Sequence, residues 1–117
     1  MDIPYDDNPA MRDMWDSMIA LYTRFNLLPP TRLAVGRKLK EEAGEFIVAM
    51  KHGTPEELAD EAADVIFVLL GGLYACGLKR TDIIGGLYRV MAKNGAKTPT
   101  THRTQNGTIE RIRDGDK

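Results

Sequence analysis

The sequence contains little of what secreted, membrane-spanning or nucleic-acid-binding proteins usually carry. Cys76 is the single cysteine, so no intramolecular disulfide can form and the chain suits a reducing compartment. The formal net charge is -1, which disfavours binding to duplex nucleic acid because such binding usually needs a basic stripe. The longest apolar stretch, residues 62–78, is short for a membrane span and contains Asp64, so we expect a buried helix there.

The composition is that of an ordinary globular domain. Hydrophobic residues make up 43% and charged residues 28%, which excludes a disordered or fibrous protein. Residues 1–8 are acidic and lack an apolar segment, so we expect no signal peptide and a cytoplasmic location. The 117 residues suit a single domain, with a core over about residues 9–97 and a polar tail over 98–117.

Capping residues and helical periodicity predict an all-α fold. Thr54 and Pro55, with Glu57 three residues after the threonine, form a strong helix-start signal, and Thr31 can cap the preceding helix. Short links between the helices favour an antiparallel four-helix-type bundle. The polar residues that follow are expected to form an extended tail with a turn at Asn106-Gly107. The predicted helices cover about residues 9–26, 32–52, 55–76 and 81–94.

Two acidic residues share a stripe with the apolar residues of the third predicted helix. Glu61 and Asp64 are three residues apart, and the stripe continues through Val65 and Val68. Both carboxylates therefore lie on the face that becomes the core. Burying an ionised carboxylate without a partner is strongly unfavourable. A basic side chain, a proton or a metal ion must accompany this pair.

A second acidic pair lies on the preceding helix. Glu42 and Glu45 are also three residues apart, and antiparallel packing would bring them to Glu61 and Asp64. Four adjacent carboxylates repel one another and take up protons unless cations lie between them. Hard oxygen ligands favour Mg²⁺, with Mn²⁺ as a substitute, over zinc or copper. A di-iron bundle is disfavoured because its usual Glu-x-x-His motif is missing.

The same charges also fit a structural interpretation without a metal. Arg37 and Glu41 are four residues apart, as are Lys38 and Glu42, which is the spacing of ordinary surface ion pairs on a helix. The charge pattern of the second helix alone leaves both interpretations open. The two acidic pairs together are more specific than either pair.

The segment Lys40–Phe46, followed by Glu61–Val65, resembles the Glu-Glu-x-x-Glu … Glu-x-x-Asp signature of MazG-like nucleoside triphosphate pyrophosphohydrolases. This all-α superfamily also includes phosphoribosyl-ATP pyrophosphohydrolase and the all-α dUTP and dCTP pyrophosphatases. The resemblance extends over about residues 33–97. It implies Mg²⁺-dependent hydrolysis of a (deoxy)nucleoside triphosphate to the monophosphate and pyrophosphate, in a homodimer or homotetramer.

The resemblance also implies roles for individual residues. Glu41 would activate the attacking water. Lys93 and Lys97 would hold phosphates, and Asn94 would touch the sugar or the base. Without any ligand, these lysines would also complement the dipole at the end of the last helix, and the asparagine could help to end it. Lys38 is a weaker phosphate-binding candidate, and the Mg²⁺ ligands would be Glu42, Glu45, Glu61 and Asp64.

Three other interpretations stay open from the sequence. The first is a phosphoribosyl-ATP pyrophosphohydrolase of histidine biosynthesis, ranked lower because the first helix and the tail look additional to a minimal version of that enzyme. The second is a non-catalytic helical dimer that binds a partner, in which the carboxylates serve only as ion pairs. A metal-binding regulatory protein would be stabilised by Mg²⁺ but would form no product.

Overall fold

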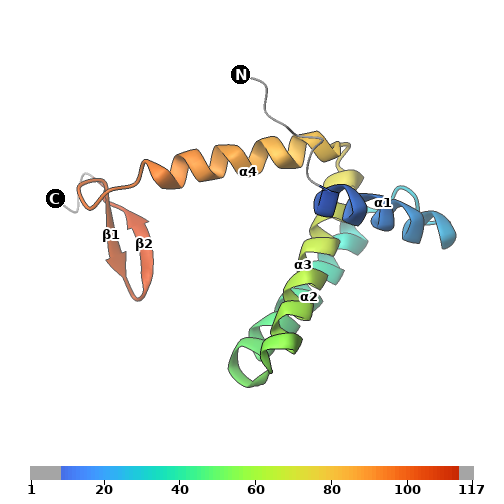
Figure 1. The fold of residues 1–117 in the computed structure, drawn as a ribbon, viewed down its shortest axis with the longest axis horizontal. Helices are drawn as coiled ribbons and strands as arrows, with labels where there is room; N and C mark the ends of the chain where they lie inside the picture. Colours follow the sequence, from blue (N-terminus) through green and yellow to red (C-terminus); the bar gives the residue numbers. More distant parts are fainter. Residues whose placement is uncertain (1–8, 114–117) are drawn as a thin grey trace. The chain divides into compact units, whose positions relative to one another are not determined.

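The computed structural model describes residues 9–113, and these form four helices followed by a two-stranded hairpin. The all-α class predicted from the sequence is confirmed. Residues 1–8, on which the expectation about a signal peptide rests, and residues 114–117 lie outside the described part. The elements are α1 (Pro9–Arg24), α2 (Arg32–His52), α3 (Pro55–Ala75), α4 (Arg80–Gly95), β1 (His102–Gln105) and β2 (Thr108–Arg111) (Figure 1).

The chain divides into two compact units, residues 1–84 and 85–117. The N-terminal unit contains α1, α2, α3 and the start of α4, and the C-terminal unit contains the rest of α4 and the hairpin. The division falls at Gly85-Gly86, where two glycines weaken the helix intrinsically, although α4 continues through both. The predicted four-helix bundle stays a prediction beyond the packing within the N-terminal unit.

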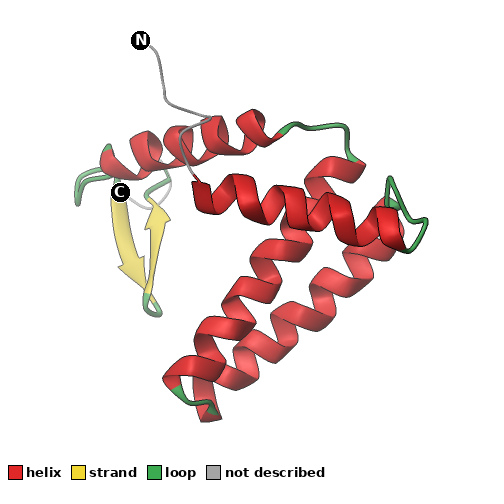
Figure 2. Cartoon of the chain, turned by 45° about the vertical axis from the view of Figure 1, so that its right-hand side comes forward, coloured by secondary structure: helices red, strands yellow, loops and turns green. Residues whose placement is uncertain are grey.

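Threonine caps begin both α2 and α3, as predicted. The Thr31 hydroxyl accepts a hydrogen bond from the Ala34 amide at 3.2 Å, and the Thr54 hydroxyl accepts one from the Glu57 amide at 3.2 Å. Only Gly53 and Thr54 connect the two helices. The short connection makes α2 and α3 run antiparallel and side by side, as Figure 2 shows.

Thr54→Ala is expected to lower the free energy of unfolding by about 1 kcal/mol, because the Glu57 amide loses its capping acceptor. Urea unfolding followed by circular dichroism measures this loss. Thr23→Ala is the matched control, since the Thr23 hydroxyl donates only to the Ile19 carbonyl of the same helix. We expect the control to change stability by less than about 0.5 kcal/mol. Equal losses in both variants would contradict a capping role.

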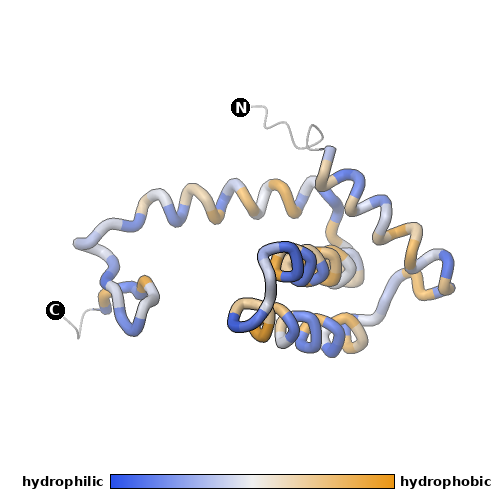
Figure 3. Tube along the Cα trace, turned by 60° about the horizontal axis from the view of Figure 1, so that its bottom comes forward, coloured by the Kyte–Doolittle hydropathy of each residue, from blue (hydrophilic) through white to orange (hydrophobic). Residues whose placement is uncertain are grey.

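The core of the N-terminal unit lies where α1 and α2 contact α3. Figure 3 shows apolar and hydrophilic residues interleaved along these helices, the pattern of helices that bury one side. α3, which contains most of the stretch expected to form a buried helix, contacts both neighbours but leaves Ile66 and Leu69 each 43% exposed. The buried apolar residues are Met18, Val35, Ala49, Val68, Leu70 and Ile84.

The paired glycines in α3 allow this close packing. A Cβ atom added at Gly71 would lie 2.9 Å from the Tyr22 hydroxyl of α1. One added at Gly72 would lie 3.1 Å from a methyl group of Val35 in α2. A larger residue would displace the Tyr22 side chain at the first position and crowd Val35 at the second, which accounts for two glycines here despite their weak helix propensity.

The C-terminal unit adds a β-hairpin to the predicted polar tail. The turn expected at Asn106-Gly107 is present, with φ angles of 53° and 79° at these two residues. Positive φ at both positions is typical of a type I′ turn, which matches the twist of paired antiparallel strands. β1 and β2 pair so that His102 lies opposite Arg111. The turn thus folds back a segment that was expected to be extended.

Among residues 9–113, no single helix has both the length and the apolar character needed to cross a membrane. α3 and α4 meet that requirement only when taken together as a bent pair.

Candidate metal centre

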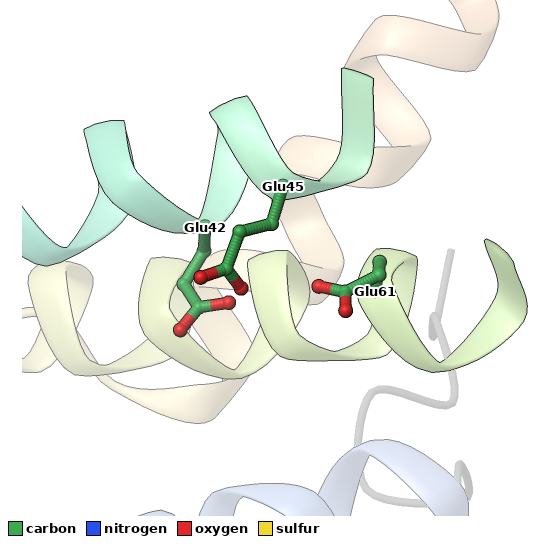
Figure 4. Close-up of side chains that lie close together, drawn as sticks. All are labelled: Glu42, Glu45 and Glu61. Carbon is green, nitrogen blue, oxygen red and sulfur yellow. The ribbon is translucent and has the colours of Figure 1, made fainter. Parts of the chain in front are cut away.

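Acidic residues of α2 and α3 meet where the two helices contact each other. One carboxylate oxygen from each of Glu42, Glu45 and Glu61 lies within 4.8 Å of the other two. Figure 4 shows Glu42 and Glu45 reaching from α2 toward α3, where the Glu61 carboxylate lies beside them. The antiparallel pair of helices α2 and α3 therefore brings together three of the four carboxylates that were predicted to converge. These three residues are called the glutamate cluster.

The cluster is only partly neutralised by a basic residue. The Lys38 ammonium lies 3.3 Å from Oε1 of Glu42 and 3.3 Å from Oε1 of Glu41. Glu42 is 8% exposed, and its second oxygen, Oε2, is buried without a hydrogen bond. Oε2 of Glu61 is buried without a hydrogen bond as well. Buried carboxylate oxygens without partners are unfavourable, so Lys38 alone does not satisfy the cluster.

Mutual repulsion changes the acid–base properties of the cluster. The nearby charge of Glu42 raises the pKa of the Glu45 carboxyl, and desolvation and the charge of Glu61 act in the same direction. The hydrogen bonds and charges of Glu41 and Glu42 raise the pKa of the Lys38 ammonium. Lys38 is therefore held as a cation beside Glu42, while Glu45 and Glu61 still repel each other.

The donor set fits a hard divalent cation. The three clustered side chains offer only carboxylate oxygens, which Mg²⁺ and Mn²⁺ prefer. In the structural interpretation, the ion pair with Lys38 offsets the negative charge of Glu42. That ion pair leaves the buried Oε2 atom of Glu61 without a partner. A cation between the helices would satisfy that oxygen and reverse the repulsion within the cluster.

Two other residues of α2 and α3 that were predicted to belong to the site do not join the cluster. Asp64, the fourth predicted metal ligand, is exposed and lies one helical turn beyond Glu61, with a side chain one methylene shorter than glutamate. Glu41, the predicted water-activating residue, has 57% of its side chain exposed and pairs with Lys38. Their roles as ligand and base stay predictions.

The predicted phosphate-binding residues of the last helix belong to the C-terminal unit. Lys93 and Asn94 lie in the last turn of α4, and Lys97 follows its end. The glutamate cluster belongs to the other unit, and the contacts of these three residues with a substrate stay predictions.

A hollow of about 620 Å³ borders the glutamate cluster, a volume typical of small-molecule pockets. Residues 41, 45, 48 and 52 all line it, and their spacing of four, three and four places them on one face of α2. Val48 and His52 were missing from the predicted site, and this spacing is the signal that identifies them. The lining residues are Glu41, Gly44, Glu45, Val48, Ala49, His52, Gly53, Glu57 and Glu61.

The similarity of this chain to known proteins lies mainly in the helices that carry the glutamate cluster. Residues 26–90, more than half of the chain, match a family model described as phosphoribosyl-ATP pyrophosphohydrolase. The matched residues include α2, α3 and the whole glutamate cluster, whereas α1 and the β-hairpin lie outside. No solved structure matches the chain significantly.

Curated relatives match over part of their length. The histidine biosynthesis bifunctional protein HisIE of Thermus thermophilus is 48% identical over 52 residues, which is 44% of this chain and 24% of that protein. The phosphoribosyl-ATP pyrophosphatase of Methanoregula boonei is 42% identical over 52 residues, covering 44% of this chain and 50% of that protein. The corresponding protein of Methanosphaerula palustris is 50% identical over 50 residues, 43% of this chain and 50% of that protein. The chain thus spans half or less of these relatives.

Proposed function

The chain belongs to the phosphoribosyl-ATP pyrophosphohydrolase family, and we propose that it cleaves phosphoribosyl-ATP between the α- and β-phosphates in a metal-dependent reaction. The products are phosphoribosyl-AMP and pyrophosphate. The glutamate cluster supports the proposal most directly, because it lies inside the matched segment and two of its buried oxygens have no partner. The sequence placed free nucleoside triphosphates first, but the names of the relatives favour phosphoribosyl-ATP.

Different acidic residues of the protein would bind the metal ion and activate the attacking water. Glu42, Glu45 and Glu61 would hold Mg²⁺, with Asp64 as a further ligand from the next turn of α3. When bound, the ion neutralises phosphate oxygens and lowers the pKa of a coordinated water. Glu41 accepts a proton from the water that attacks the α-phosphorus. The new P–O bond forms as the bond to the pyrophosphate oxygen breaks.

Binding of the substrate uses cationic and apolar groups. The hollow beside the glutamate cluster would receive the nucleotide, with Val48 and His52 on its α2 side. Lys38, held at the edge of the cluster by Glu42, would contact a phosphate. Lys93, Asn94 and Lys97 are proposed as further substrate contacts. A homodimer or homotetramer and a cytoplasmic location belong to the same proposal.

The test is product analysis with phosphoribosyl-ATP and with a panel of ribo- and deoxyribonucleoside triphosphates, each in Mg²⁺ and in EDTA. We expect release of pyrophosphate and phosphoribosyl-AMP in Mg²⁺ and none in EDTA. Cleavage of free triphosphates but not of phosphoribosyl-ATP would overturn the proposed substrate and keep the reaction type. Release of inorganic phosphate would place the cleaved bond elsewhere and contradict the mechanism.

A further inference from the structure

Charge is unevenly divided between the two units of the chain. Residues 1–84 carry nine Lys or Arg and fourteen Asp or Glu, a formal charge of −5. Residues 85–117 carry seven Lys or Arg and three Asp or Glu, a formal charge of +4. The net charge of the chain is therefore close to zero although its C-terminal unit is basic. The family model covers only part of that unit.

Basic side chains of this unit gather around one hollow of about 560 Å³. Lys93 and Lys97 line it from the end of α4, and His102 and Arg111 line it from the hairpin. The remaining lining residues are Ala96, Thr101 and Ile109, so its described lining contains no acidic side chain. This set of seven residues is called the basic hollow.

The hairpin register explains why the basic hollow excludes the nearby acid. His102 lies opposite Arg111, and Ile109 is two residues before Arg111, so these three side chains share one face of the hairpin. Glu110 lies opposite Arg103 on the other face. Alternation along the strands thus keeps Glu110 out of the basic hollow, although Glu110 and Arg111 both line a neighbouring hollow.

Local hydrogen bonds hold the loop that joins α4 to β1. The Thr98 amide donates to the Thr101 hydroxyl at 3.1 Å, and the Ile112 amide donates to the Thr101 carbonyl at 2.9 Å. The Thr101 hydroxyl lies 2.8 Å from Nδ1 of His102. One ring nitrogen of His102 is thereby engaged, which leaves Nε2 to interact with a ligand.

The helix dipole explains only half of this arrangement. Lys93 and Lys97 complement the negative end of α4 without any ligand. A two-stranded hairpin has only a small net dipole, so Arg111 gains no comparable stabilisation from its own element. Three permanent cations around one hollow repel one another unless an anion lies between them.

We propose that the basic hollow binds the phosphate groups of a small ligand, either a nucleotide or pyrophosphate, with Arg111 and His102 as the hairpin's contribution. Arg and His⁺ side chains both donate strong hydrogen bonds to phosphate oxygens. The volume suits a small ligand, and Ile109 and Ala96 supply apolar surface beside the cations. A hollow of this size fits a small ligand better than a nucleic-acid strand, which usually needs an extended basic stripe.

The choice of a nucleotide rests on the proposed function, but binding of phosphate by the hollow requires no turnover. The test is calorimetric titration of pyrophosphate and of ATP into the full chain in EDTA at low salt. We expect Arg111→Gln to weaken binding of pyrophosphate by about 10-fold, since one charge-assisted contact is lost. Arg89→Gln is the matched control, because it removes the same charge from α4 within the C-terminal unit without lining the hollow. We expect the control to stay within about two-fold of wild type.

The titrations separate the two possible sources of phosphate. Binding of ATP at least about 10-fold tighter than pyrophosphate would identify a nucleotide, whereas equal affinities would identify pyrophosphate itself. Equal affinities of wild type, Arg111→Gln and Arg89→Gln would overturn the proposal. Tighter binding of a single-stranded oligonucleotide than of pyrophosphate would overturn it too.

A second measurement covers the case in which Arg111→Gln disturbs the hairpin. Amide NMR shifts of the wild-type chain are followed during titration with pyrophosphate in EDTA, and we expect Lys97 and Thr101 to shift. Shifts confined to residues 9–84 would refute the basic hollow. Pyrophosphate binding without hydrolysis of any substrate would contradict the proposed function alone, whereas hydrolysis without pyrophosphate binding would contradict the hollow alone.

Discussion

Glu45→Gln is expected to reduce Mg²⁺-dependent pyrophosphate release on the order of 100-fold or more, measured as kcat/KM. Glu45 supplies one of the three carboxylates of the glutamate cluster. Removing its charge weakens binding of the ion and the neutralisation of phosphate oxygens, which is worth several kcal/mol of transition-state stabilisation. Glu45 is a cleaner choice than Glu42, because a change at Glu42 also removes the partner of Lys38.

Glu56→Gln is the matched control for this experiment. Glu56 lies in the first turn of α3, outside both the glutamate cluster and the hollow beside it, and the chemical change is identical. We expect its kcat/KM to stay within about two-fold of wild type. A folded Glu45→Gln protein with full Mg²⁺-dependent activity would show that the cluster does not hold the catalytic ion.

Asp64→Asn in the same assay tests whether the fourth predicted ligand takes part. The side chain is exposed and lies outside the cluster, so the substitution leaves the α2–α3 contact intact. If Asp64 binds the ion, we expect a loss comparable to that of Glu45→Gln. Activity equal to that of Glu56→Gln would restrict the ligands from this chain to the three clustered glutamates.

Mg²⁺ is expected to raise the melting temperature of the wild-type protein by roughly 10 °C when its concentration is about 100 times the dissociation constant. The ion binds the folded arrangement of the glutamate cluster, which the unfolded chain lacks. Glu45→Gln should lose most of this rise. In EDTA the same variant should melt at a higher temperature than wild type, because Glu42 and Glu61 lose a repelling neighbour.

Differential scanning fluorimetry in Mg²⁺ and in EDTA, at matched ionic strength, measures both effects. Glu56→Gln serves again as the control and should follow wild type in each condition. No Mg²⁺-dependent rise in the wild type would favour the interpretation in which the carboxylates serve only as ion pairs. A rise without turnover of any substrate would favour a metal-binding regulatory protein.

The parts of the fold that depend on local interactions were predictable from the sequence. Thr54 caps α3 because its hydroxyl reaches an amide three residues away, and this requires no other part of the chain. The turn at Asn106-Gly107 follows in the same way from two residues that tolerate positive φ. The sequence missed the strands beside that turn, because the two four-residue strands contain only one apolar residue, Ile109, and carry no periodic apolar signal.

The acidic residues could also be selected from their spacing, but their arrangement depended on how the helices pack. Residues three apart share a helix face, so the sequence alone determined that Glu42 and Glu45 lie on one face of their helix and that Glu61 and Asp64 lie on one face of theirs. The rotation of α2 against α3, and the length of each side chain, decided that Glu61 joins the cluster and that the shorter Asp64 stays exposed. The contact of Lys38 with Glu42 and the unpartnered oxygens likewise appear only in three dimensions, because burial and solvation are properties of packed helices.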